Sequence, residues 1–254
     1  MTLVATGFIA SLLAGLATGV GSLPALFFKE VPDNLMNTML GGAAGVMLAA
    51  TSFSLIVPGI EQGDLIWPGY GVYVVALGIV LGAFSLDLVD RILPHEHFVL
   101  GHEGPSSRMK KIWLFIIAIT IHNFPEGMAV GVGFGGGDIA NGKSLAIGIG
   151  LQNMPEGLAV ALPLLGLGYS RLKAIGIATL TGLVEPVGGL LGVWAVSIFQ
   201  PILPLGLAFA AGAMLFVISD EIIPETHAKG KSRLATFGIV IGFIIMMALD
   251  NLLG

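Results

Sequence analysis

Four ionisable side chains lie near the centres of long apolar segments that otherwise carry almost no charge. They are one imidazole and three carboxylates, His122, Glu126, Glu156 and Glu185. Ionisable groups are costly in hydrocarbon and usually mark a pathway or a binding site. Three carboxylates that face one another repel strongly, and either protonation or a divalent cation removes this repulsion. Imidazole and carboxylate ligands without a thiolate suit zinc, and also iron, manganese, cobalt, nickel or cadmium.

A nine-residue motif that includes two of these carboxylates occurs twice. It reads HNFPEGMAV from His122 and QNMPEGLAV from Gln152, with six identical positions. The four-residue spacing places His122 and Glu126 on one helix face, and Gln152 and Glu156 on another. Consecutive spans run antiparallel, so the repeat predicts a pseudo-two-fold axis in the membrane plane, an arrangement by which many transporters build a midplane site.

Prolines accompany each of the three carboxylates. Pro125 and Pro155 have no N–H, so each is expected to kink its helix and free a carbonyl oxygen four residues earlier. Pro186, directly after Glu185, repeats the theme. With two asparagines nearby, the residues allow two metal ions bridged by Glu126 and Glu156. The competing structural interpretation, a buried carboxylate that only fixes helix register, leaves all three without a basic partner.

The elements that position these residues are predicted to be membrane-spanning helices. The chain has 254 residues, of which 55% are hydrophobic and 11% charged, with a mean hydropathy of +0.94. Soluble domains carry about 25% charged residues, so the composition nearly excludes a soluble enzyme, and it excludes disorder, collagen and coiled coil. There is no cysteine, which rules out disulfides and thiolate metal sites.

Eight segments reach the roughly 20 apolar residues that a spanning helix needs, and period-two alternation is absent. We therefore predict an all-α integral membrane protein that forms a single transmembrane domain over residues 1–254. The predicted spans are residues 3–28, 35–60, 69–93, 111–136, 143–168, 172–199, 202–224 and 233–254. The first is interpreted as a span and not as a signal peptide, because it lacks a basic n-region and is too long.

The distribution of basic residues predicts the orientation. If both termini face outside, Lys143 is the basic residue on that side, and ten lie inside: Lys29, Arg91, Arg108, Lys110, Lys111, Arg171, Lys173, Lys229, Lys231 and Arg233. Such a bias follows the positive-inside rule. The longest loop, residues 94–110, is then cytosolic.

The motifs HNFPEG and QNMPEG, followed by Glu185-Pro186, resemble those of the ZIP (Zrt-, Irt-like) divalent metal transporters, in particular the bacterial GufA-like members. The His-bearing loop and the sequence ISDEIIPETH from Ile218 fit the same family. The resemblance covers all eight spans. It implies a 3+2+3 helix arrangement, a homodimer, and elevator-like motion of one helix bundle against the other.

The resemblance also implies a binuclear centre at mid-membrane. One metal would take His122, Glu126, Gln152 and Glu156. The second would take the asparagines and share two carboxylates, which gives Asn123, Glu126, Asn153, Glu156 and Glu185. Some relatives carry aspartate where Asn153 stands, and this chain lacks that charge.

Entry and exit residues are predicted from the flanking spans. Met47, Ser54 and Glu61 are seven residues apart and fall on about one face, although Pro58 is expected to distort it. Asp220 and Glu221 lie near the predicted cytosolic end of the seventh span, and relatives often have histidine where Asp220 stands. In the cytosolic loop, His95, His97 and His102 are candidates for metal buffering or sensing, with solvated histidines as the alternative.

The sequence therefore predicts a transporter that moves a divalent metal, zinc first, from outside into the cytosol by alternating access. Cadmium, iron, manganese, cobalt and nickel remain alternative substrates, and proton coupling stays open. The expected setting is the lipid bilayer of a bacterial inner membrane, with no nucleic acid and no soluble protein partner. An intramembrane metallohydrolase would need an open metal position and a substrate cleft, and no HExxH motif is present. A structural or sensing membrane protein would bind metal without flux.

Overall fold

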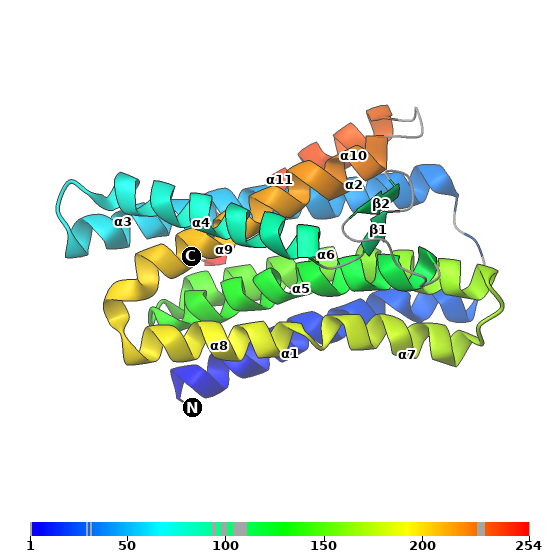
Figure 1. Ribbon diagram of the computed structural model, residues 1–254, viewed down its shortest axis with the longest axis horizontal. Helices are drawn as coiled ribbons and strands as arrows, with labels where there is room; N and C mark the ends of the chain where they lie inside the picture. Colours follow the sequence, from blue (N-terminus) through cyan, green and yellow to red (C-terminus); the bar gives the residue numbers. More distant parts are fainter. Residues whose placement is uncertain are drawn as a thin grey trace.

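The computed structural model describes residues 2–28, 30, 32–92, 95–97, 101–103, 111–227 and 232–253 (Figure 1). Within these residues the protein is helical apart from one two-stranded hairpin. The helices are α1 (Leu3–Ser22), α2 (Asp33–Ala49), α3 (Val57–Ile66), α4 (Gly71–Ile92), α5 (Lys111–Gly135), α6 (Ile139–Gly166), α7 (Arg171–Gly182), α8 (Glu185–Ile198), α9 (Leu203–Val217), α10 (Ile223–His227) and α11 (Ser232–Leu253). Shorter helical segments join them: η1 (Leu23–Leu26), η2 (Ala50–Ile56), η3 (Gln200–Ile202) and η4 (Ile218–Ile222).

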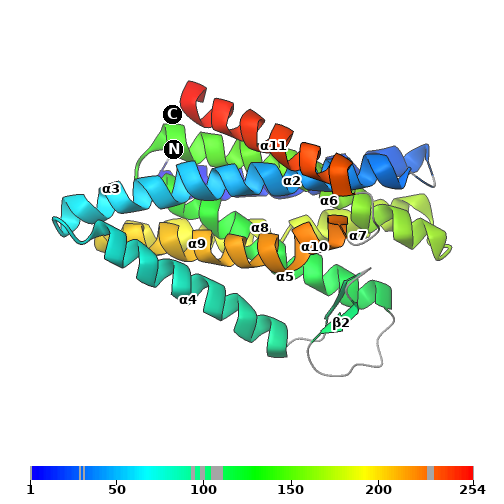
Figure 2. The same ribbon diagram turned by 90° about the horizontal axis from the view of Figure 1, so that it is seen from above.

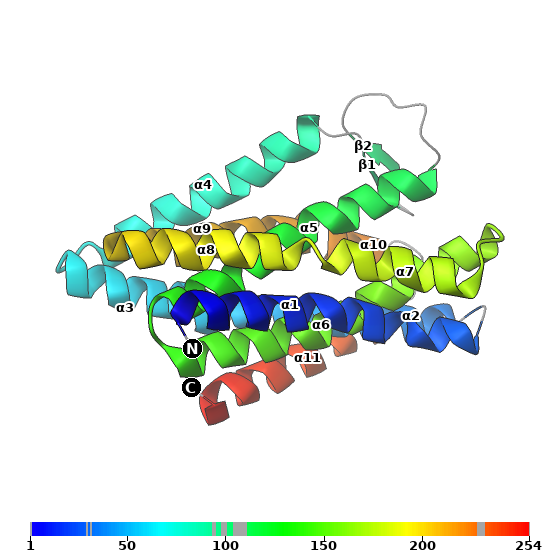
Figure 3. The ribbon, with the colours of Figure 1, turned by 90° about the horizontal axis from the view of Figure 1, so that it is seen from below.

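In the described part of the chain, seven helical stretches are long and apolar enough to cross a membrane by length and composition. They match seven of the eight predicted spans, and α5 occupies the fourth, so the all-helical membrane fold is confirmed at this level. The second stretch continues to Ile66, beyond its predicted end at residue 60. The start of α1, the end of α11 and the α5–α6 turn lie toward the same end of the molecule (Figures 1 and 3), which we call the terminal end.

Proline shapes three of the spans. The π-helical segments η2 and η4 each end just before a helix with proline at its second residue, Pro58 in α3 and Pro224 in α10. Proline cannot donate to the carbonyl four residues earlier and its ring collides with it, so the wider π turn accommodates the ring. In the sixth span, helix α7 ends at Gly182 and α8 begins at Glu185, with Pro186 in its first turn. In contrast, α5 and α6 continue through Pro125 and Pro155.

The helices form two bundles, and within each bundle glycines allow the backbones to approach closely. In the first bundle, α1, α5, α6, α7 and α8 approach so closely that a Cβ at Gly131 would meet the Gly189 carbonyl of α8, and one at Gly157 would meet Thr18 of α1. Figure 3 shows α1 beside α6 and along α7 and α8. In the second bundle, which contains α2, α3, α4, α9, α10 and α11, a Cβ at Gly45 would meet the Ile239 carbonyl. Figure 2 shows α2 beside α11. Such backbone-to-backbone packing is typical of tightly associated membrane helices.

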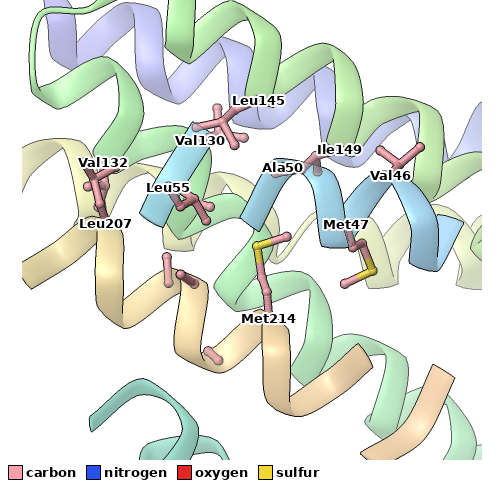
Figure 4. Close-up of a cluster of buried hydrophobic side chains, with 14 of the residues drawn as sticks. Val46, Met47, Ala50, Leu55, Val130, Val132, Leu145, Ile149, Leu207 and Met214 are labelled. Carbon is pink, nitrogen blue, oxygen red and sulfur yellow. The ribbon is translucent and has the colours of Figure 1, made fainter. Parts of the chain in front are cut away.

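Between the two bundles the contact is made by larger apolar side chains. Figure 4 shows Leu145 and Ile149 of α6 directed toward η2 and α2, and Leu55 and Met214 from the second bundle in the same cluster. Where a glycine faces the other bundle it meets a side chain: a Cβ at Gly148 would meet the Met246 thioether. The interface between bundles is therefore a side-chain surface, unlike the backbone contacts within each bundle.

The hairpin pairs β1 (His95–His97) with β2 (Gly101–Glu103) in antiparallel register, with His95 opposite Glu103. It falls in the segment predicted as the His-bearing loop 94–110. All other residues of that loop lie outside the described residues.

Candidate metal centre

Three helical elements bring the repeated motifs and Glu185 together in the middle of the first bundle. Helix α5 carries His122, Asn123 and Glu126, and the antiparallel helix α6 carries the equivalent positions of the second motif. The seven candidate side chains are all buried: His122, Asn123, Glu126, Gln152, Asn153, Glu156 and Glu185. The largest exposed fraction among them is 5%, so all of these polar groups are removed from the surface of the chain.

The motif glycines determine how closely the carboxylates approach. A Cβ at Gly127 would collide with the backbone of Glu185, so the glycine of the first motif lets α8 lie directly against α5 beside Glu126. Gly157 does the same for α6 against α1, where it meets Thr18. In each motif the glycine after the glutamate is therefore a close-approach position that sets the spacing of the site.

Two side-chain amides of α6 donate hydrogen bonds to carboxylates on neighbouring helices. Gln152 Nε2 donates to Glu126 Oε1 at 2.7 Å, which links α6 to α5. Asn153 Nδ2 donates to Glu185 Oε1 at 2.6 Å and to the Ala14 carbonyl at 2.8 Å, which links α6 to both α8 and α1. Each amide thus uses its nitrogen to bind a carboxylate, and its oxygen stays available as an acceptor.

Within the seven candidate side chains, six buried acceptor oxygens have no hydrogen-bond donor among the described residues. They belong to three carboxylates and three amides: Asn123 Oδ1, Glu126 Oε2, Gln152 Oε1, Asn153 Oδ1, Glu156 Oε2 and Glu185 Oε2. A buried acceptor without a donor is costly, and a bound cation or protonation of the carboxylates would remove this cost. Oxygen donors of this kind, with one imidazole, form a ligand set that suits a divalent cation.

The charges at the centre are unbalanced. Glu126 interacts electrostatically with both Glu156 and Glu185, and Glu185 interacts with Glu156, so the three carboxylates repel one another when charged. His122 is close enough to Glu156 to attract its negative charge. Across the described residues, no three His, Asp or Glu side chains are already drawn together as a preformed metal site. The amides of Gln152 and Asn153 instead bind one oxygen each of Glu126 and Glu185, and the other oxygen of each carboxylate has no donor in the described part of the chain.

The predicted entrance residues separate in the structure. Met47 and Ser54 are buried, whereas Glu61 is exposed on α3. The π-helical segment η2 widens the turn between them and shifts the seven-residue register that predicted a common face. Met47 lies in the apolar cluster between the bundles (Figure 4), and Ser54 is hydrogen-bonded to Asp250 of α11 at 2.6 Å.

At the opposite end, Asp220 is exposed in η4. The side chains of Glu221, His95, His97 and His102 lie outside the described part of the structure, and the backbone alone places them in η4 and in the hairpin. The exit role of Asp220 and Glu221 and the metal-buffering or sensing role of the three histidines therefore stay predictions.

Sequence reasoning missed a polar cluster at the terminal end. Asp250 accepts hydrogen bonds from Ser54 and from Ser144, and Asn141 donates to the Ser54 carbonyl. A signal was present, because Asp250 is the one acidic residue of the predicted eighth span. Its partners are far away in sequence, and no spacing rule connects them.

The chain is similar in sequence to a family of zinc transporters. The family model described as ZIP Zinc transporter matches residues 101–250. The chain is 46% identical over 251 residues to zinc transporter GufA of Myxococcus xanthus. This match covers 98% of this chain and 99% of that protein. It is 46% identical over 241 residues to zinc transporter ZIPB of Bordetella bronchiseptica, covering 94% of this chain and 78% of the relative. The human zinc transporter ZIP11 is 35% identical, with 93% of this chain and 94% of the relative covered.

Proposed function

Because the chain belongs to the ZIP family of zinc transporters, as a GufA-like bacterial member, we propose that it carries divalent metal, zinc first, across the membrane through the centre on α5, α6 and α8. The function is transport and not catalysis, and the metal is the substrate. The proposed direction is from outside into the cytosol, with the terminal end outside, in a bacterial inner membrane.

The observation that carries this proposal is the group of six buried acceptor oxygens for which the described residues supply no donor. Three of them belong to carboxylates that repel one another when charged. In our assignment, one ion is held by His122, Glu126, Gln152 and Glu156. A second ion uses the asparagine oxygens and Glu185, and Glu126 and Glu156 bridge the two. Because the ion is cargo, a site built from neutral amides and shared carboxylates provides charge compensation without a rigid cage.

The contact between the two bundles supports alternating access. The backbones interlock through glycine within each bundle, whereas apolar side chains such as Ile149 and Met214 meet between bundles. Interlocked backbones favour rigid units, and a side-chain surface permits one unit to move against the other. All seven centre residues belong to the first bundle, so we propose that this bundle carries the metal in an elevator-like movement. A single transmembrane domain, the 3+2+3 arrangement and a homodimer complete the proposal.

Zinc influx into proteoliposomes that contain a fluorescent zinc indicator tests the proposed centre. We expect His122→Ala and Glu156→Ala to abolish influx while the protein still elutes as the folded species in size exclusion, because each change removes a ligand and not a packing contact. Glu30→Ala is the matched control, since Glu30 is exposed, and it should leave influx unchanged. Undiminished influx in both centre variants would refute the assignment. A competition series with zinc, cadmium, iron, manganese, cobalt and nickel then ranks the substrates.

A further inference from the structure

A cluster of four polar residues at the terminal end joins the two bundles. Ser54 Oγ and Ser144 Oγ both donate to Asp250 Oδ1, at 2.6 Å and 3.3 Å. Asn141 Nδ2 donates to the Ser54 carbonyl oxygen at 3.0 Å. Ser54 and Asp250 belong to the second bundle, and Asn141 and Ser144 belong to α6 of the first. We call these four residues the polar clamp.

Pro58 explains why the Ser54 carbonyl can take part in the clamp. Proline cannot donate to the carbonyl four residues earlier, which is that of Ser54. The Ser54 carbonyl therefore has capacity to accept a hydrogen bond from another helix, and Asn141 supplies it. The π-helical turn of η2 also places the Ser54 side chain toward α11, where it meets Asp250. One residue of the second bundle thus contributes both an acceptor and a donor to the clamp.

The clamp lies above an apolar barrier. Ser144 precedes Gln152 of the proposed centre by eight residues of one helix, which corresponds to about 12 Å along its axis. Between these two levels, Leu145 and Ile149 of α6 meet Leu55 and Ala50, and all four side chains have no exposed surface (Figure 4). Buried apolar side chains from both bundles therefore lie between the clamp and the proposed centre.

We propose that the polar clamp holds the two bundles together at the terminal end and keeps the metal centre closed to that side, so that its hydrogen bonds must break when the bundles move. This inference rests on the alternating access proposed above. Asp250 and Ser144 act as positioning residues: they lie outside the proposed centre and fix which side of the barrier is closed. Two bonds join the bundles, from Ser144 to Asp250 and from Asn141 to the Ser54 carbonyl, and the loss of either shifts the population of the closed state by a modest, measurable factor.

A single reporter cysteine tests the clamp. Because the chain has no native cysteine, no other thiol of the protein reacts with the reagent. Ala50→Cys places a small thiol in the fully buried barrier. Intact cells are treated with a membrane-impermeant maleimide, and the rate of modification is measured by mass shift. Leu65→Cys, at a position of α3 that is 76% exposed near the terminal end, reports that the reagent reaches this side.

We expect Ser144→Ala and Asn141→Ala to raise the labelling rate of the reporter by about three- to ten-fold, because each removes one hydrogen bond between bundles. Ser52→Ala is the matched control, since its hydroxyl donates only within its own helix, to Leu48, and labelling should stay within two-fold. In the Asp250→Ala background, Ser144→Ala should add no further increase, because both changes remove the same bond.

The outcome is independent of zinc flux. Unchanged labelling in Ser144→Ala, Asn141→Ala and Asp250→Ala, with Leu65→Cys labelled normally, would overturn the clamp and leave the proposed metal centre untouched. Persistent zinc influx in His122→Ala and Glu156→Ala would overturn the centre, whatever the labelling shows. Size-exclusion elution of each variant separates loss of the clamp from loss of folding.

Discussion

Replacing Asn153 by aspartate exchanges a hydrogen-bond donor for a negative oxygen at the middle of the metal centre. The native amide donates to Glu185 Oε1 at 2.6 Å and to the Ala14 carbonyl at 2.8 Å, and its side chain is fully buried. The carboxylate that replaces it is nearly isosteric but offers acceptors to two acceptors. In the absence of metal, the change should therefore destabilise the protein.

The size of the effect follows from these two contacts. A hydrogen bond to a charged group contributes about 2 kcal/mol and one to a neutral carbonyl about 1 kcal/mol, so their loss costs about 3 kcal/mol. Repulsion between the introduced carboxylate and that of Glu185 adds to this cost when both are charged. For a chain of this length, we expect a decrease in Tm of roughly 6–10 °C in the presence of a chelator.

Zinc should offset part of this loss. A carboxylate at position 153 is a better cation ligand than an amide oxygen, so the aspartate variant should gain more stability from zinc than the native chain gains. A ten-fold tighter site adds about 1.4 kcal/mol of stabilisation at saturating zinc. Thermal unfolding of the purified protein in detergent, with chelator and with zinc, measures both quantities.

Asn251→Asp provides the control, because Asn251 also donates to a backbone carbonyl, that of Met247, but is exposed on α11. It should change Tm by less than about 2 °C in either condition. The reasoning fails if Asn153→Asp is as stable as the native chain in chelator, or if zinc raises its Tm no more than it raises that of the native chain.

Three further outcomes follow from the same geometry. Gly45→Ala should destabilise the protein by about 2 kcal/mol or more, because the added Cβ meets the backbone of α11. Gly176→Ala has open space around the added Cβ and should stabilise the protein by up to about 1 kcal/mol. Equal free energies of unfolding for the two variants would contradict the packing argument. Zinc at about 100 times its Kd should stabilise the native chain by about 2.7 kcal/mol, and Glu126→Gln should lose most of this gain in a thermal-shift titration. His227→Ala removes the 3.1 Å hydrogen bond that joins α10 to α11 and should accelerate amide hydrogen exchange in α10 without changing zinc influx; equal exchange in both proteins would show that this bond does not stabilise the helix.

The elements and their chemistry could be predicted from local sequence. A span is recognised from about 20 consecutive apolar residues, and a carboxylate such as Glu156 is conspicuous there because hydrocarbon offers it no solvation. The repeated motif similarly indicated that α5 and α6 contribute equivalent groups, because spacing along one helix determines which side chains share a face. The seven residues of the proposed centre were all identified from these patterns and from the family resemblance that they carry.

Which side chains share a face along the second span did not follow from such local rules. Met47, Ser54 and Glu61 were expected to share about one face with a distortion at Pro58, and the structure has a π-helical segment before Pro58 that changes this register. The proline was visible in the sequence, but whether a helix bends, breaks or widens at a proline depends on what its neighbours can accommodate. The sixth span breaks at residues 183–184, whereas α5 continues through Pro125.

The sequence by itself determined that this is a helical membrane protein with buried carboxylates and imidazole at one depth, because those properties depend on residue type and spacing alone. Only the tertiary structure decided that Gly127 lies against Glu185, that Asn153 ties three helices together, and that Ser144 reaches Asp250. Each of these contacts joins residues far apart in the chain. They form only where two backbones can approach closely, and no single helix specifies which partner that will be.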